Sequence, residues 1–133
     1  MPPVRVVTAK NAAITVAYAL AGWALCATTM GVGMRVTGLG NALVTHAVAA
    51  PVIFAALSFV YFRRTTSWPP LYAATAFLGI VMLMDVFVVA LLIERSFAMF
   101  ESILGTWLPF LLIFVSTWWT GLAVRRTTHR AAA

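Results

Sequence analysis

Two side chains in long apolar stretches of this sequence could do chemistry, the carboxyl group of Asp85 and the imidazole of His46. A histidine beside a carboxylate can act as acid and base, and a carboxylate within a membrane can bind a cation or couple to protons. An ionised carboxylate in such surroundings costs about 2.5–3.5 kcal/mol on insertion scales. We therefore expect Asp85 to face other helices and to be paired, protonated or hydrated.

Other polar residues near the same depth complete a candidate site. At 1.5 Å rise per residue, Asp85 lies about 13 Å below Glu94, and His46 lies about 9 Å below the start of its own segment. Thr28 and Thr106 fall at similar depths, so we predict a polar pocket with Asp85 at its floor and His46 in its wall. Four charged residues are expected at its outer rim, namely Arg35, Glu94, Arg95 and Glu101. The opposite half of the protein is predicted to be nearly inert.

The same residues also have a structural interpretation. Asp85 and His46 could hydrogen-bond to each other, or to the two threonines, and so fix the register of the helices. An enzyme that used Asp85, His46 and Glu94 together would need all three in one pocket. The nine residues between Asp85 and Glu94 place these two near 180° apart on an α-helix, which argues against that use unless the helix is distorted.

The other reactive side chains give no reason to expect a cofactor or a metal ion. The sequence does not identify catalytic residues. Cys26 is the only cysteine, which excludes an intrachain disulfide, a CxxC centre and a thiolate zinc site. We interpret it as a buried apolar side chain. A transmembrane haem needs two facing histidines, whereas the second histidine, His129, lies near the C-terminus. The sequence also lacks a phosphate-binding loop.

The composition identifies the elements that must position these residues. Hydrophobic residues make up 63% of the 133 residues and charged residues 9%, with a mean hydropathy of +1.00. Soluble domains carry about 25% charged residues, so the chain is an all-α integral membrane protein rather than a cytosolic enzyme or a nucleic-acid-binding protein. A span needs about 20 apolar residues. Four helices are expected, at about 12–34, 41–62, 71–93 and 102–124, in a single transmembrane domain covering 1–133.

Short connections between these segments predict an up-down-up-down bundle. Gly38 and Gly40 suit a tight turn, and Trp68-Pro69-Pro70 ends one helix and starts the next. Seven basic residues fall on one side, namely Arg5, Lys10, Arg63, Arg64, Arg125, Arg126 and Arg130, and Arg35 and Arg95 fall on the other. Because basic residues stay on the cytoplasmic side, both termini are predicted to be cytoplasmic, in the plasma (inner) membrane, with the site facing outward.

Small and aromatic residues predict how the helices pack. Alanines recur every four residues at Ala9, Ala13, Ala17 and Ala21, a pattern that lets membrane helices approach closely. Ala42, Ala49 and Ala50 share a helix face with His46. Tyr61 and Tyr72 are expected in an interfacial aromatic belt. The expected partners are the lipid bilayer and either further copies of the chain or a larger membrane complex, but not nucleic acid.

The function can be ranked but not assigned from these residues. The first hypothesis is an accessory or oligomeric membrane subunit, because reactive groups are few and packing surface is abundant. The alternative is a small transporter or channel with an outward-facing polar site around Asp85 and His46. A third hypothesis is an integral-membrane enzyme that acts on an apolar substrate.

Overall fold

The computed structural model describes residues 9–65 and 68–132, and within them it contains helices and no strands. Arg5 and the side chain of His129 lie outside this description. Four helical stretches are long and apolar enough to cross a membrane, and they span Ala9–Thr37, Leu39–Arg64, Pro70–Ile93 and Ile103–Thr127. The all-helical fold with four such helices is therefore confirmed. Most ends lie one to three residues beyond the predicted bounds, whereas the third span ends at Ile93 as predicted and the fourth begins one residue later than predicted, at Ile103.

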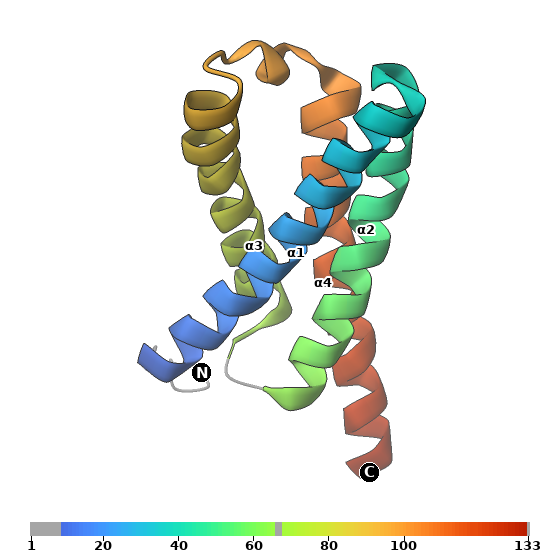
Figure 1. Ribbon diagram of the computed structural model, residues 1–133. Coiled ribbons are helices and arrows are strands. Elements are labelled where there is room, and N and C mark those ends of the chain that lie inside the picture. The colour runs from blue at the N-terminus through green and yellow to red at the C-terminus, as the bar shows by residue number, and fades with distance from the viewer. Residues whose placement is uncertain (1–8, 66–67, 133) are drawn as a thin grey trace.

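The first two helices are regular and the last two contain irregular segments. The α-helices are α1 (Ala9–Thr37), α2 (Leu39–Arg64), α3 (Pro70–Met84) and α4 (Leu108–Ala132). A π-helix, η1 (Asp85–Ile93), continues α3, and a 3-10 turn, η2 (Ala98–Glu101), and a second π-helical segment, η3 (Ile103–Trp107), lead into α4. Figure 1 places both chain ends at one end of the bundle, and we call that half the terminal half. The half with the α1–α2 turn and η2 is the distal half.

Two short connections turn the chain where the sequence predicts it. Gly38 alone joins α1 to α2, with a φ of +87°, a backbone conformation that residues with a side chain rarely adopt and that glycine adopts readily. Gly40, which was expected in the same turn, lies inside the first turn of α2. Pro70 begins α3, a position that suits proline because the first helical N–H needs no partner within the helix.

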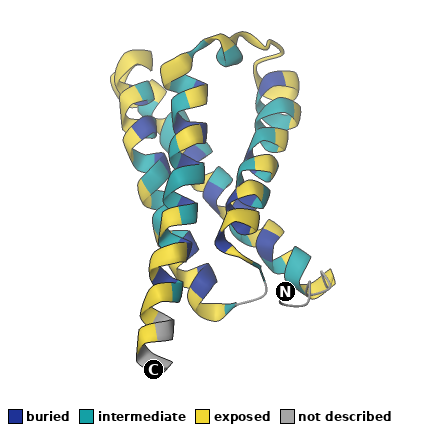
Figure 2. Cartoon of the chain, turned by 180° about the vertical axis from the view of Figure 1, so that it is seen from behind, coloured by how far each residue is buried: buried dark blue, intermediate teal, exposed yellow. Residues whose placement is uncertain are grey.

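The order of the helices around the bundle differs from their order along the chain. α1 packs against α2 and α3, and α4 packs against the same two helices. The sequence of neighbours is therefore α1, α2, α4, α3, and the consecutive helices α2 and α3 lie across a diagonal. Figure 2 shows the exposed residues on the outward faces of these helices, where lipid would surround them.

Aromatic rings form the core of the terminal half and of the middle of the bundle. The ring centroids of Tyr61 and Phe77 are 5.2 Å apart, and those of Phe54 and Phe77 are 6.2 Å apart. Two glycines make room for such rings. A Cβ on Gly22 would lie 2.5 Å from the ring of Phe54, and a Cβ on Gly121 would lie 2.7 Å from Cβ of Pro70. These close approaches require glycine.

The alanine stripe does not pack within one copy of the chain, and the prediction that Tyr61 is interfacial is wrong. The alanine stripe of α1 is exposed, and the buried face of that helix is formed by Thr15, Ala19, Gly22 and Cys26. Packing against Phe54 selects the face with the glycine rather than the face with most alanines. Tyr61 is only 2% exposed and not interfacial, because its hydroxyl hydrogen-bonds to that of Thr15 at 2.9 Å. By contrast, Ala42 and Ala50 are buried as expected, and Ala49 is half-buried.

Candidate functional site

A cavity of about 450 Å³ occupies the distal half, and all four helical spans line it. Its walls are mainly apolar and include the methionines Met30, Met34 and Met99. Its polar lining residues are Trp23, Cys26, His46, Asp85, Glu94, Ser102 and Thr106. Cavities of about 300–1,000 Å³ with few polar groups are typical of small-molecule sites. Of the four residues predicted to form a pocket, the structure brings Asp85, His46 and Thr106 to this cavity.

Asp85 is held by a tryptophan from a neighbouring helix. The indole Nε1 of Trp23 on α1 donates a hydrogen bond to Oδ1 of Asp85 at 2.9 Å. The carboxyl group thus has a partner from another helix, as expected, but the partner is neither His46 nor a threonine. The sequence did carry a signal for this role. Trp23 lies near the middle of its span, whereas membrane tryptophans concentrate at the interfaces.

The π-helix that follows Asp85 turns Glu94 toward the same cavity. The backbone N–H of Glu94 bonds to the carbonyl of Val89, five residues earlier, at 2.7 Å. Such i→i+5 bonding puts more residues into each turn than an α-helix has. The angle around the helix axis between Asp85 and Glu94 therefore differs from the 180° expected for an α-helix. Both Asp85 and Glu94 line the cavity. The sequence argues against a shared pocket only for an undistorted helix, and the π-helix η1 is the distortion that lets both residues line it.

His46 contributes a ring nitrogen that the described residues leave unpaired. It lies in the cavity wall on α2, and its Nδ1 is buried without a hydrogen-bond partner. His46 therefore does not pair with Asp85 through this nitrogen. A buried polar atom without a partner costs about 1–3 kcal/mol, and a ligand that bonds to it would recover that cost.

The hydroxyl groups of the distal half are bonded locally. Thr106 is buried in the cavity lining and donates to the carbonyl of Met99 at 2.5 Å. The hydroxyl of Ser102 accepts a bond from the N–H of Gly105 at 2.9 Å. These bonds order the segment that joins η2 to α4 beside the cavity. Thr28 is exposed and donates to the carbonyl of Ala24 in its own helix, so it does not line the cavity.

The four predicted rim residues are exposed at the distal end, and Glu94 is the one that also lines the cavity. No ion pair within 4.0 Å joins Arg35, Glu94, Arg95 and Glu101, all of which lie in the described part of the chain. Arg95 has a φ of +52°, which is uncommon for a residue with a side chain and marks the sharp change of direction after η1.

The charges of the cavity lining are of one sign. It contains two carboxyl groups and no lysine or arginine. Within residues 9–65 and 68–132 no group of three or more His, Cys, Asp and Glu side chains could hold a metal ion. Chemically, the site can bind an organic molecule through two acids, an imidazole nitrogen and apolar walls. Comparisons of this chain with protein-family models, with curated proteins and with solved structures give no match.

Proposed function

We propose that this chain is a small multi-pass membrane protein that binds a small, mainly apolar cation in the distal cavity, as a transporter or channel would. The lining charge carries this proposal, since Asp85 and Glu94 face a cavity without a basic side chain that is permanently charged. Within a membrane, a carboxylate is a functional candidate by default, and a cation is its natural partner. The apolar walls would hold the hydrocarbon part of the same molecule.

Each polar residue has a distinct part in this proposal. Glu94, at the exposed rim, attracts the cation first. Asp85 lies deeper and holds it, with the carboxyl group oriented by the indole of Trp23. Nδ1 of His46 is free to accept or donate one further hydrogen bond, which would select ligands that carry a polar hydrogen or an oxygen. Thr106 has a structural part, because its hydroxyl is already used by Met99.

A binding measurement with a defined probe tests this function. The protein is reconstituted in lipid nanodiscs and titrated with radiolabelled benzyltrimethylammonium, a small apolar cation. Asp85→Asn should weaken saturable binding by tenfold or more, about 1.4 kcal/mol, because it removes the deeper charge. Glu94→Gln should weaken it less. Glu101→Gln is the matched control, since this acid lies at the same end but not in the cavity lining, and it should bind like the wild type.

Two outcomes would reject cation binding in the cavity, namely no saturable binding to the wild-type protein or equal binding to all three variants. Uptake of the probe into sealed vesicles then separates transport from binding alone.

The accessory-subunit hypothesis predicts different results. Native mass spectrometry after mild detergent extraction would show a stoichiometric second protein, and Asp85→Asn would be tolerated. For an enzyme, His46→Ala would remove a lipid-like product from the membrane.

We also infer that the protein lies in the plasma (inner) membrane with both termini in the cytoplasm and the cavity facing outward. The support is the excess of basic residues on one side, seven against two, which favours retention of that side in the cytoplasm. In a Cys26→Ala background, an impermeant maleimide applied to intact cells should label Ser96→Cys and not Thr127→Cys. The reverse labelling would show the opposite orientation.

A further inference from the structure

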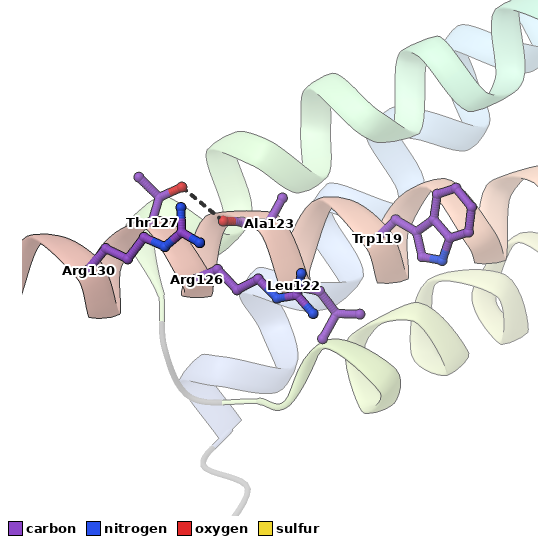
Figure 3. Close-up of a pocket in the computed structure, with 6 residues that line it drawn as sticks. All are labelled: Trp119, Leu122, Ala123, Arg126, Thr127 and Arg130. Carbon is purple, nitrogen blue, oxygen red and sulfur yellow. Dashed lines mark hydrogen bonds between the residues drawn. The ribbon is translucent and has the colours of Figure 1, made fainter.

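We propose that the terminal half carries a binding site for an anionic phospholipid on one face of α4. A surface hollow of about 490 Å³ lies there, separate from the distal cavity, and it is formed by α4 alone. Its residues follow one another along the helix in Figure 3 and are Trp119, Leu122, Ala123, Arg126, Thr127 and Arg130. Their spacings of three and four residues make them a single stripe on the helix surface.

The stripe changes from apolar to basic along the helix. Trp119 is 65% exposed and Leu122 is 37% exposed, so both offer surface to an acyl chain. Arg126 and Arg130 follow toward the C-terminus, one turn or about 6 Å apart along the axis. The hydroxyl of Thr127 between them donates to the carbonyl of Ala123 at 3.0 Å, as Figure 3 shows. The order of groups matches that of a phospholipid, whose hydrocarbon adjoins its phosphate.

A contact on another side of α4 fixes the position of these arginines relative to the connection between α2 and α3. Arg125 donates a hydrogen bond to the carbonyl of Trp68, which ties α4 to the connection between α2 and α3. α2 ends at Arg64, and Figure 1 shows the last turns of α4 extending beyond that end. Because α2 ends first, it does not cover the face of α4 that carries Arg126 and Arg130.

The acidic residues of the protein cannot neutralise this face. The sequence has three of them, Asp85, Glu94 and Glu101, and Figure 1 places their segments toward the other end of the bundle. Arginine binds phosphate through paired N–H groups, and the cytoplasmic leaflet, on whose side the proposed orientation places this end of α4, is rich in anionic headgroups. A free phosphate would use only the arginines, whereas a lipid also uses the apolar part of the stripe. Anionic phospholipid is therefore the ligand that matches the whole hollow.

Native mass spectrometry of the purified chain tests the site, because it counts lipids on intact protein. Phosphatidylglycerol should bind wild-type protein more tightly than phosphatidylcholine does. The double variant R126Q/R130Q should bind phosphatidylglycerol about 30-fold more weakly, equivalent to ~2 kcal/mol for two arginines near the headgroups. The double variant R63Q/R64Q is the control, since it removes the same charge at the same end but outside the hollow, and it should retain the affinity.

The results separate a site from general attraction. Equal weakening in the two double variants, or no weakening in R126Q/R130Q, would overturn the proposal. So would an equal affinity of the wild type for the two lipids. Competition by millimolar inorganic phosphate that fully displaces the lipid would indicate an anion site without a lipid. Since this proposal does not depend on the distal cavity, loss of cation binding in Asp85→Asn leaves it untouched.

Discussion

The two halves of this bundle are built in different ways from the same kind of helix. In the terminal half the helices are regular, and aromatic rings pack between them against glycines such as Gly121. In the distal half the chain passes through two π-helical segments and a 3-10 turn beside a cavity with charged residues. One half is therefore closely packed, and the other keeps space and polar groups.

The difference shows where irregular backbone is tolerated in a membrane. Backbone that departs from the α-helix leaves N–H and C=O groups without their usual partners, which is acceptable only where the segment is buried in protein or lines a cavity. Residues of η1 and η3, among them Asp85, Val89 and Thr106, line the cavity. The irregular segments and the candidate site thus coincide, and π-helical turns are frequent at functional sites. The terminal half should therefore contribute most of the stability, and the distal half should bind the cation.

Truncation of Phe54 should produce the largest effect that separates the halves. Its side chain is 0% exposed between α1 and α3. In soluble cores this change costs about 3–5 kcal/mol, and in lipid the transfer part disappears while the cavity part remains. We expect Phe54→Ala to lower the free energy of unfolding by about 2 kcal/mol or more, measured by steric trapping in bicelles.

The matched control is Met30→Ala in the wall of the distal cavity. Its side chain already borders open space, so its removal should cost less than about 1 kcal/mol. If Met30→Ala were as destabilising as Phe54→Ala, the two halves would not differ in packing and the comparison would fail.

Adding a single methyl group should change the free energy of unfolding by a smaller amount, and the change should have opposite signs in the two halves. A Cβ on Gly121 would lie 2.7 Å from Pro70 and 2.8 Å from the ring of Phe62, so Gly121→Ala forces groups apart. The strain of about 1–3 kcal/mol outweighs the gain in helix propensity of ~1 kcal/mol, leaving a loss of about 1 kcal/mol.

Gly31, in the cavity lining, has nothing within 4 Å of the same methyl group. Gly31→Ala should therefore raise the free energy of unfolding by up to ~1 kcal/mol through helix propensity alone. Thermal midpoints in one detergent measure both variants. A lower thermal midpoint for both variants would mean that the helices are packed as tightly in the distal half as in the terminal half.

Much of the fold could be predicted because its signals extend over whole helices. Four apolar stretches of span length, in which Asp85 is the only charged residue, specify four helices, and Gly38 specifies the turn between the first two. That Asp85, His46 and Thr106 border one cavity could also be predicted, since depth follows from counting residues at 1.5 Å each. These inferences need only length, charge and rise per residue.

The remaining features depend on which way a side chain points, and the sequence does not contain that directly. Thr28 has the predicted depth but lies on the exposed side of α1. Glu94 reaches the cavity because η1 is a π-helix, and no residue pattern in the sequence predicts a π-helix there. The position of Tyr61 near the end of its span favours the interface, whereas its bond to Thr15 keeps it in the core. Packing between helices decides such details.

The smallest predicted effect compares one hydrogen bond between helices in each half. Tyr61→Phe removes the 2.9 Å bond to Thr15, and Trp23→Phe removes the 2.9 Å bond to Asp85. Such bonds in membrane proteins contribute about 0.6 kcal/mol on average, so both variants should lose about that much stability. Only Trp23→Phe should also weaken binding of benzyltrimethylammonium, because it releases the carboxyl group that holds the cation. Thr15 keeps its bond to the carbonyl of Asn11, which limits the damage in the other variant. Weaker probe binding in Tyr61→Phe as well would mean that the two halves act as one unit, and the division between a stabilising half and a cation-binding half would have to be abandoned.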